Sequence, residues 1–310
     1  MSKRRIVIGS RGSRLALTQS EMVKSLLVQQ HADLSVDIKI IKTKGDVILD
    51  TPLAKIGDKG LFTKEIEDAL LNNEIDLAVH SMKDLPTLLP KELKIGAVLK
   101  REDPRDAFIS HKYRRFIDLP RGAIIATSSL RRGANVLMHR PDLKLVDIRG
   151  NVDTRLRKLI KFDYDGMILA VAGLIRLGYQ SEISEIISPE LMLTAAAQGA
   201  LGIEIRETDA SMSELIAPLN DQDAEICVRA ERAFLKRLEG GCQVPIGTLA
   251  TVQNESIVLK GIVSALNGKP SFRDEIKGEK NEPEHLGEKL AEHLLAVGAQ
   301  NILNEIYREK

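Results

Sequence analysis

The sequence predicts an α/β protein that ends in a smaller α+β domain. Short runs of β-branched and other apolar residues alternate with helical patterns over most of the chain, and three β-rich runs followed by helices close it. Strands that alternate with helices of this length indicate mostly parallel sheets joined by crossover helices. The length of 310 residues allows about two domains, or three smaller ones.

In chain order, a buried strand at residues 6–8 leads into a helix over residues 15–30. Further strands are expected at 36–41, 75–79, 123–126, 143–146 and 167–170, and further helices over 61–71 and from Ser129 and Val152 onward. A helix over residues 224–238 then precedes β-rich runs at 247–253, 257–265 and 271–276. Polar breaks at residues 100–105 and 220–223 mark candidate domain boundaries.

The composition limits the class of protein. Hydrophobic residues make up 43% and charged residues 29%, which is typical of a globular protein and excludes a disordered tail, a collagen or a disulfide-held mini-protein. The formal net charge is +1, whereas proteins that bind DNA through their overall field are usually strongly basic. Aromatic residues make up only 3%, with no Trp, which leaves little material for stacking bases. We therefore expect no nucleic-acid partner.

The cysteines and the N-terminal residues bear on the compartment. Two cysteines are too few for a disulfide framework in a chain of this length. Only residues 6–9 are apolar near the start, whereas a signal peptide needs about 7–15 apolar residues. No run approaches the roughly 18 apolar residues of a membrane helix. We expect a cytoplasmic protein with reduced thiols and no membrane partner.

Basic residues are concentrated in residues 121–160, where nine Lys or Arg face three acids and the local balance is +6. A solvated basic face is the ordinary explanation for such a stretch. Here, however, the hydroxyls of residues 127–129 can cap a helix whose first turn holds Arg131 and Arg132, where Asp or Glu is normal. Hydroxyls, free backbone N–H groups and guanidinium groups together indicate a cradle for carboxylate or phosphate.

A second turn of the same kind follows the first strand. Residues 9–14, Gly-Ser-Arg-Gly-Ser-Arg, open the first helix with arginines and no acid. The spacing of a dinucleotide-binding loop, G-x-G-x-x-G, is absent. Two such turns predict a small polyanionic ligand in a cleft.

Two further residues are candidates for chemistry. Asp84 follows the strand at 75–79, and it is either an exposed turn residue or a catalytic carboxylate at a strand's carboxyl end. Cys242 lies in a loop between two glycines and a proline, which suits covalent attachment, although a loop cysteine is often incidental. A Cys–His hydrolase with His80 or His111 as base stays open, without a local signature. Cys227, by contrast, shares a helical face with apolar residues and is expected in the core.

Eight short motifs occur in order along almost the whole chain. They are Gly9-Ser10-Arg11 with Ser13 and Leu15-Ala16-Leu17, Lys59-Gly60-Leu61-Phe62, Ala78 to Pro86, Arg101 to Asp106, Thr127 to Arg132, Arg149-Gly150-Asn151-Val152 with Thr154-Arg155-Leu156, Gln198 to Gly202, and Gly240 to Gly247. No single motif is decisive, but the ordered set resembles that of the porphobilinogen deaminases, also called hydroxymethylbilane synthases.

The resemblance implies three domains in a monomer. Two α/β domains similar to periplasmic binding proteins would surround a cleft, and a smaller α+β domain would carry the cysteine loop. We expect residues 1–99 with 200–218 in the first, 105–194 in the second and 222–310 in the third.

The resemblance also implies a transferase of porphyrin and haem biosynthesis. Cys242 would bear a dipyrromethane cofactor through a thioether, made by the protein from two substrate molecules. Four porphobilinogens would be added head to tail, each losing ammonia, before water releases the linear tetrapyrrole hydroxymethylbilane. Asp84 and Lys83 are the residues implied at the catalytic centre: Asp84 would stabilise the cation left by the loss of ammonia and shuttle protons, and Lys83 would assist in binding the carboxylate side chains.

Each pyrrole carries an acetate and a propionate, and the fork of an arginine binds carboxylates in bidentate fashion. The residues implied for cofactor binding are Cys242, Arg11, Ser13, Ser81, Thr127, Ser129, Arg131, Arg132, Arg149, Asn151, Arg155, Arg176, Gln198 and Gly199. Those implied at the substrate cleft are Gln19, Lys55, Lys59 and Phe62, and no metal is expected.

The chain departs from the family pattern at a few loop positions. Ala126, Ala197 and Asp58 stand where many relatives have glycine, and Gly133 stands where a longer side chain is common. These departures bear on loop conformation. The alternative function is a non-catalytic two-domain module that binds a small anion, since its first two domains would have the same pattern.

Overall fold

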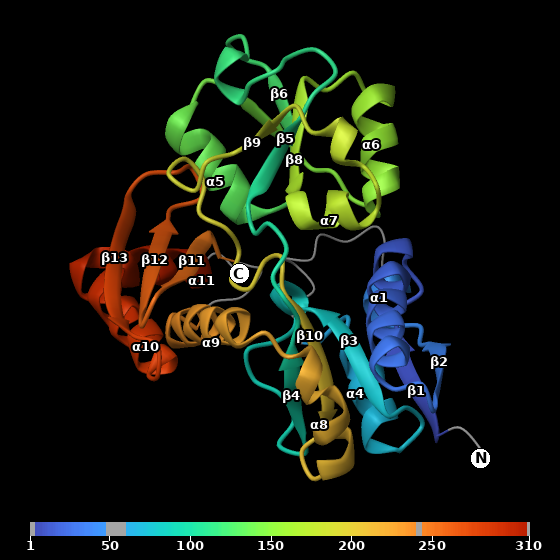
Figure 1. The fold of residues 1–310 in the computed structure, drawn as a ribbon. Helices are drawn as coiled ribbons and strands as arrows, with labels where there is room; N and C mark the ends of the chain where they lie inside the picture. Colours follow the sequence, from blue (N-terminus) through green and yellow to red (C-terminus); the bar gives the residue numbers. More distant parts are fainter. Residues whose placement is uncertain (1–3, 48–59, 240–243, 309–310) are drawn as a thin grey trace. The chain divides into compact units, whose positions relative to one another are not determined.

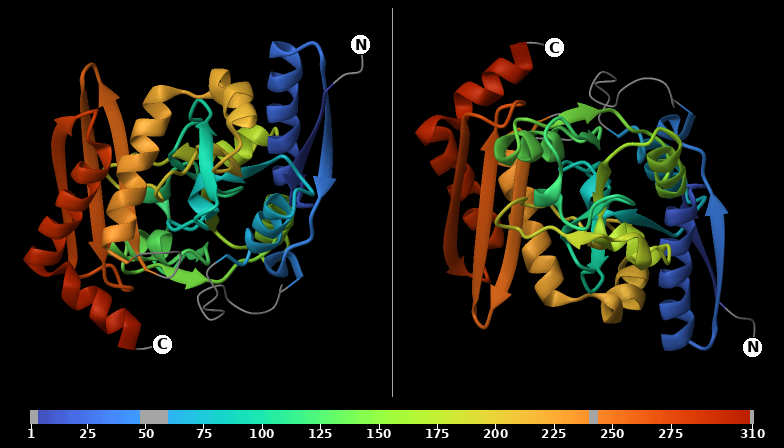
Figure 2. Two further views of the ribbon diagram at one scale, coloured as in Figure 1. Left: turned by 90° about the horizontal axis from the view of Figure 1, so that it is seen from below. Right: turned by 90° about the horizontal axis from the view of Figure 1, so that it is seen from above.

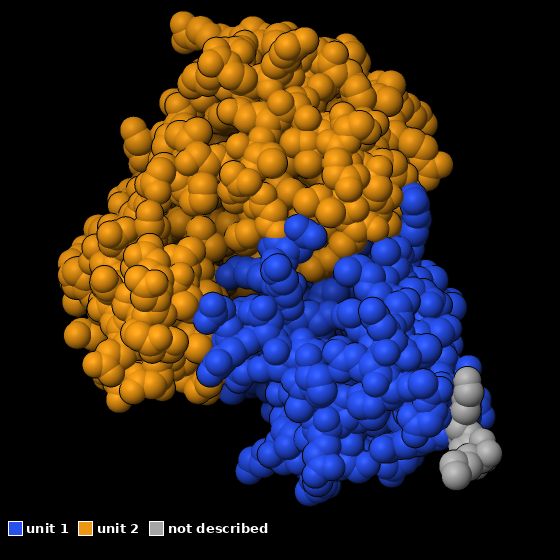
Figure 3. All heavy atoms as spheres, in the orientation of Figure 1, with its two compact units in different colours: residues 1–50, 58–102, 200–225 blue, residues 51–57, 103–199, 226–310 orange. Residues whose placement is uncertain are grey.

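The computed structural model describes residues 4–47, 60–239 and 244–308 (Figure 1). Their packing divides the chain into two units, coloured in Figure 3. Unit 1 holds residues 1–50, 58–102 and 200–225, and unit 2 holds residues 51–57, 103–199 and 226–310. None of the helices in the described ranges is both long and apolar enough to span a membrane.

Unit 1 is a five-stranded sheet between helices. Its strands lie in the order β2 (Leu34–Ile40), β1 (Arg4–Ser10), β3 (Leu77–Ser81), β10 (Leu201–Arg206) and β4 (Leu93–Val98). Strand β1 pairs in parallel with β2 and β3, whereas β10 runs antiparallel to β3 and β4. The helices are α1 (Arg14–Gln30), α2 (Lys44–Val47), α4 (Lys64–Leu71) and α8 (Ala210–Ile216).

Alternation along β1 divides the core of unit 1 between the two faces of the sheet. Ile6 and Ile8 pack with Val23 of α1 and with residues of α8. Val7, between them, packs with Leu70 of α4. Successive side chains of a strand point to opposite faces, so helices cover both sides of this sheet.

Unit 2 contains a second five-stranded sheet with the same succession of pairings. Its order is β7 (Lys144–Val146), β6 (Ile124–Ala126), β8 (Gly166–Ala170), β5 (Asp106–Ile109) and β9 (Glu185–Ile186). The first three strands are parallel, and β5 is antiparallel to both β8 and β9. Phe108 packs towards α5 (Leu130–His139). Its neighbour Ile109 packs towards α6 (Val152–Lys161) and α7 (Val171–Arg176).

The C-terminal residues of unit 2 form an antiparallel meander, whose strands run side by side in Figure 2. The elements are α9 (Gln222–Arg237), β11 (Ile246–Gln253), β12 (Ser256–Ser264), β13 (Ser271–Glu279), α10 (Pro283–Leu294) and α11 (Gln300–Arg308). The helices and the sheet share one hydrophobic cluster, which includes Phe234 and Leu259. Cys227 is 6% exposed in this cluster, which confirms its predicted core position.

The α/β class and the C-terminal α+β block are confirmed, and every strand and helix predicted above is present with its ends shifted by a few residues. The strands predicted in the two large sheets are parallel to one another, as expected, whereas the unpredicted strands β10 and β5 add antiparallel pairs. Both strands pair with strands that are far from them in the sequence, which local patterns do not show. The three-domain division stays a prediction, although each of its three parts has a hydrophobic cluster of its own.

Candidate active site

In unit 1, four predicted residues lie at the carboxyl ends of the neighbouring parallel strands β1 and β3. Arg11 directly follows β1, and the hydroxyl of Ser13 caps α1 by accepting a hydrogen bond from the Ala16 amide at 3.2 Å. Ser81 ends β3, and Asp84 stands exposed on the single 3₁₀ turn that follows. Ligands of α/β sheets bind at this edge of the strands.

Two further polar residues accompany this edge. Gln19 of α1 is only 3% exposed, and its Nε2 donates to the Ser81 hydroxyl at 3.0 Å. The side-chain amide of Gln19 therefore fixes Ser81, the residue that precedes the 3₁₀ turn. Lys83 lies half-buried on the same turn as Asp84.

The Arg11 side chain is held on two sides. Its Nη2 donates to Oδ1 of Asp46 at 2.5 Å and its Nε donates to the same oxygen at 3.2 Å, while its guanidinium carbon lies 4.1 Å from the centre of the Phe62 ring. Burial raises the pKa of the Asp46 carboxyl, but hydrogen bonds from Arg11 and Thr43 outweigh burial and lower the pKa overall. Asp46 is therefore ionised at neutral pH.

In unit 2, the turn after β6 has the predicted capping hydroxyls. The Ser129 hydroxyl accepts from the Arg132 amide at 3.4 Å, and the Thr127 hydroxyl accepts from the Ser129 amide at 3.2 Å. Arg131 and Arg132, in the first turn of α5, are 5% and 7% exposed. The two arginines thus lie inside the protein rather than on its surface.

The anion beside these arginines is a carboxylate of the protein itself. Asp106 is fully buried and accepts from Nη1 of Arg131 and from Nη2 of Arg132, both at 2.7 Å. Nε2 of Gln198 donates to Asp106 at 3.0 Å and to the Pro104 carbonyl at 2.7 Å. The two arginines therefore have an anionic partner within the protein, and their binding of a ligand carboxylate stays a prediction.

Asp106 remains charged in this interior. Burial raises the pKa of its carboxyl, but the charges of Arg131 and Arg132 and the hydrogen bonds lower it by more, so the pKa lies well below its usual range. Sequence reasoning assigned no role to Asp106, although it belongs to the motif at residues 101–106. Its position beside an arginine and after a proline was the only local signal.

The other predicted residues of unit 2 follow β7 and β8 or precede β10. Nε of Arg155 donates to the Gly150 carbonyl at 2.7 Å, beside Asn151, which caps α6 through its backbone. Nη2 of Arg176 donates to the Gly199 carbonyl at 2.6 Å. The half-buried Arg149 directly precedes Gly150 on the connection between β7 and α6. Its backbone carbonyl accepts a hydrogen bond from Nζ of Lys158 at 3.0 Å. Backbone carbonyls thus hold the guanidinium groups of Arg155 and Arg176 in place.

A fully buried glutamate that sequence reasoning missed joins three segments of unit 2. Glu231 of α9 accepts from the Ala197 amide at 2.5 Å and from the Ala250 amide at 2.7 Å. Ala197 itself has a φ of 58°, the left-handed conformation that favours the glycine expected there. The connection before β10 is thereby tied to the helix that leads towards Cys242.

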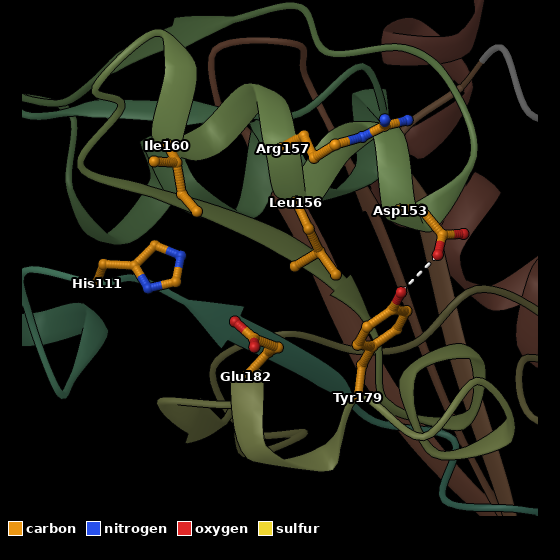
Figure 4. Close-up of a pocket in the computed structure, with 7 residues that line it drawn as sticks. All are labelled: His111, Asp153, Leu156, Arg157, Ile160, Tyr179 and Glu182. Carbon is orange, nitrogen blue, oxygen red and sulfur yellow. Dashed lines mark hydrogen bonds between the residues drawn. The ribbon is translucent and has the colours of Figure 1, made fainter.

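Three predicted residues, Cys242, Lys55 and Lys59, lie outside the described residues, as does Asp58. The two histidines considered as bases are both described. His80 is buried, with Nε2 2.9 Å from Oε2 of Glu204. His111 lines a pocket of about 500 Å³ in unit 2, where the Tyr179 hydroxyl donates to Asp153 at 2.5 Å (Figure 4). None of the predicted site residues lines this pocket.

The chemistry of the donor set fits a ligand that carries several carboxylates. Guanidinium groups and hydroxyls occur at the strand ends of both large sheets, and Arg11, Arg155 and Arg176 are held in place by other groups of the protein. Within the described ranges, no group of three or more His, Cys, Asp or Glu side chains is placed to hold a metal ion.

The fold defines an α/β protein with a smaller C-terminal α+β part, and arginines and hydroxyls lie at the strand ends of its two large sheets. Two family models match the chain: porphobilinogen deaminase, dipyromethane cofactor binding domain, over residues 6–214, and porphobilinogen deaminase, C-terminal domain, over residues 225–296. The chain belongs to the porphobilinogen deaminase family.

Curated relatives match over the whole length. The porphobilinogen deaminase of Carboxydothermus hydrogenoformans is 53% identical over 99% of both chains. That of Geobacter metallireducens is 51% identical over 100% of this chain and 97% of its own.

Solved structures with remote similarity include periplasmic proteins. A periplasmic substrate-binding protein of an ABC transporter from Coxiella burnetii is 14% identical over 69% of this chain and 91% of its own, with a TM-score of 0.44. The aliphatic sulphonate binding protein SsuA from Escherichia coli is 10% identical over 77% and 71%, with a TM-score of 0.41.

Proposed function

We propose that the chain condenses four porphobilinogen molecules head to tail, releasing ammonia at each step and hydroxymethylbilane at the end. Family membership makes it a transferase of porphyrin and haem biosynthesis that works with a dipyrromethane cofactor. The protein acts as a cytoplasmic monomer of three domains, without a nucleic-acid or membrane partner.

Cys242 carries the cofactor through a thioether. When bound, the dipyrromethane supplies the pyrrole carbon to which the first substrate is joined. Arginines at the strand ends hold its acetate and propionate groups, because the planar, permanently charged guanidinium suits carboxylates. The residues in this role are Arg11, Arg131, Arg132, Arg149, Arg155 and Arg176, assisted by Ser13, Ser81, Thr127, Ser129, Asn151, Gln198 and Gly199.

Asp84 acts on the reacting pyrrole. Its carboxylate stabilises the positive charge that develops at the pyrrole nitrogen when ammonia leaves, and it accepts and returns a proton there. Lys83, beside it, binds a substrate carboxylate. Gln19 and Phe62, together with Lys55 and Lys59, contribute to the substrate cleft.

The observation that carries this proposal is the placement of Asp84. An exposed carboxyl follows β3, and the adjacent parallel strand β1 ends at the carboxylate-binding Arg11. An acid–base group beside an anion site is what the deaminase reaction needs.

The test is to incubate the full chain with porphobilinogen and to measure ammonia and hydroxymethylbilane together. The proposal expects both products in a ratio of about four to one, as four condensations per tetrapyrrole require. A protein that binds porphobilinogen and releases no ammonia would instead be the non-catalytic anion-binding module.

A further inference from the structure

Arg11 of unit 1 uses one edge of its guanidinium for a carboxylate of its own protein. Nε and Nη2 form this edge, and both donate to Oδ1 of Asp46. A guanidinium has a second edge, made of Nη1 and Nη2, that can bind another carboxylate in bidentate fashion. The pair is 24% and 22% exposed, so the side chains are partly shielded from solvent.

Asp46 is itself held in place. The Thr43 hydroxyl, whose residue is 1% exposed, donates to Oδ2 of Asp46 at 2.8 Å. The carboxylate therefore has a fixed neighbour at each oxygen, with Arg11 on one side and Thr43 on the other. An exposed surface pair lacks such support.

The Phe62 ring supports the Arg11 guanidinium from one face. It lies under the Arg11 guanidinium, and it also lies so close to Gly45 that a Cβ there would overlap the ring carbons. The Gly45 amide donates to the Leu61 carbonyl at 2.8 Å, which joins α2 to the residue before Phe62. Only glycine at position 45 allows the ring this position.

We propose that Asp46 is a positioning residue for Arg11, holding one edge of the guanidinium on the Phe62 ring so that the other edge binds a carboxylate of the pyrrole ligand. The role rests on the proposed function, because it assigns Arg11 to the ligand. Asp46 does not touch the reacting atoms. It limits the rotation of Arg11 before the ligand arrives, and a preorganised group loses less conformational freedom on binding.

Steady-state kinetics with porphobilinogen test this role. Asp46→Asn keeps the size of the side chain and removes its charge, and we expect KM to rise about tenfold, the size expected for a charge-assisted hydrogen bond. We expect kcat to change by less than about threefold, because the interaction is made equally in the ground and transition states. Thr43→Val, which removes only the support of Asp46, should raise KM in the same direction by less.

The matched control is Asp37→Asn, which removes the carboxylate of the exposed pair with Arg5 in the same unit. It should leave KM and kcat unchanged. Asp46→Asn should also have little further effect in an Arg11→Lys background, because the fork it positions is already absent.

An unchanged KM in both Asp46→Asn and Thr43→Val, with the wild type active, would overturn the role of Asp46 alone. Effects of Asp46→Asn and Arg11→Lys that multiply would do the same. A wild-type protein that releases no ammonia would instead remove the proposed function on which the role rests.

Discussion

Asp106 accepts a hydrogen bond from Arg131 at 2.7 Å in a part of the protein where the carboxylate has no exposed surface. Arg132 binds the same carboxylate, so one buried negative charge faces two buried positive charges. Arg131 and Arg132 resemble ligand-binding residues of the family. Asp106 gives both of them a structural partner within the protein. Their remaining donors can still serve a ligand, but their positions are set from inside.

Replacing Asp106 by Asn should strongly destabilise the protein. Two guanidinium groups would then be buried without their counter-ion, which costs about 3–5 kcal/mol of unfolding free energy. Urea unfolding measures the loss. Asp118→Asn, which removes the carboxylate of the exposed pair with Arg115, is the control and should leave the urea midpoint almost unchanged. Equal midpoints for the two variants would contradict the account.

The contribution of Asp106 should also depend on pH in a defined direction. Its folded pKa is lowered, so its stabilisation is present above the pKa of an unfolded carboxyl and is lost as the pH falls towards the folded pKa. The difference in unfolding free energy between the wild type and Asp106→Asn should therefore shrink below the ordinary carboxyl range. A difference that grows on acidification would show that the sign is wrong.

Glu67 of α4 should have the opposite dependence. Burial raises its pKa, Glu204 raises it further, and the nearby Thr63 and His80 side chains only partly offset this. The folded protein thus binds this proton more tightly than the unfolded chain, and Glu67 costs stability as the pH rises through its folded pKa. Glu67→Gln, which is neutral throughout, should be more stable than the wild type at pH 8 and lose that advantage at pH 4.

Urea unfolding at the two pH values measures this difference. Glu288→Gln on the exposed face of α10 is the control, and it should follow the wild type at both pH values. A Glu67→Gln variant that is less stable than the wild type at pH 8 would contradict a raised pKa for Glu67.

Ala197→Gly should leave the stability of the protein almost unchanged, although it removes a fully buried methyl group. Ala197 has a φ of 58°, and a left-handed backbone costs a residue with a Cβ about 1–2 kcal/mol. Glycine relieves this strain, but it costs about 0.4–1 kcal/mol through the unfolded chain and about 0.8 kcal/mol for the buried methyl group that is lost, so we expect the unfolding free energy to change by less than about 1 kcal/mol.

The matched control for Ala197→Gly is the neighbouring Ala196→Gly. Ala196 is buried and has no positive φ, so glycine there should lower the free energy of unfolding. Urea unfolding compares the two variants. An equal loss of unfolding free energy in the two variants would contradict the strain assigned to Ala197.

Local features were predictable from the sequence. The hydroxyls at Thr127 and Ser129 indicated where α5 begins, and the apolar run before Asp84 indicated β3, because both signals lie within one turn or strand. The core position of Cys227 followed in the same way from the spacing of apolar residues along one helix.

Partners distant along the chain were not predictable. Asp106 lies 25 residues from Arg131 in the sequence. Glu231 lies 34 residues from Ala197, whose backbone amide donates a hydrogen bond to it. Strand β10 belongs to the first sheet, but in the sequence it follows all the strands of the second large sheet. Periodicity reports which face of an element is buried, but it does not report what lies against that face.

Asp84→Asn should slow turnover without preventing binding. Removing a carboxylate that stabilises charge and moves a proton lowers kcat by about 10²–10⁴-fold, whereas the carboxylates of porphobilinogen still meet the arginines. The rate of ammonia release and the KM for porphobilinogen measure the two effects. Asp68→Asn, on the exposed face of α4, is the control and should keep normal turnover. A near-normal kcat in Asp84→Asn would remove Asp84 from the reaction.

The intact mass of the full chain, purified in active form, shows whether Cys242 carries the cofactor. We predict that the mass exceeds that of the sequence by one dipyrromethane joined by a thioether, and that Cys242→Ser lacks this adduct. An active protein with the unmodified sequence mass would contradict the account.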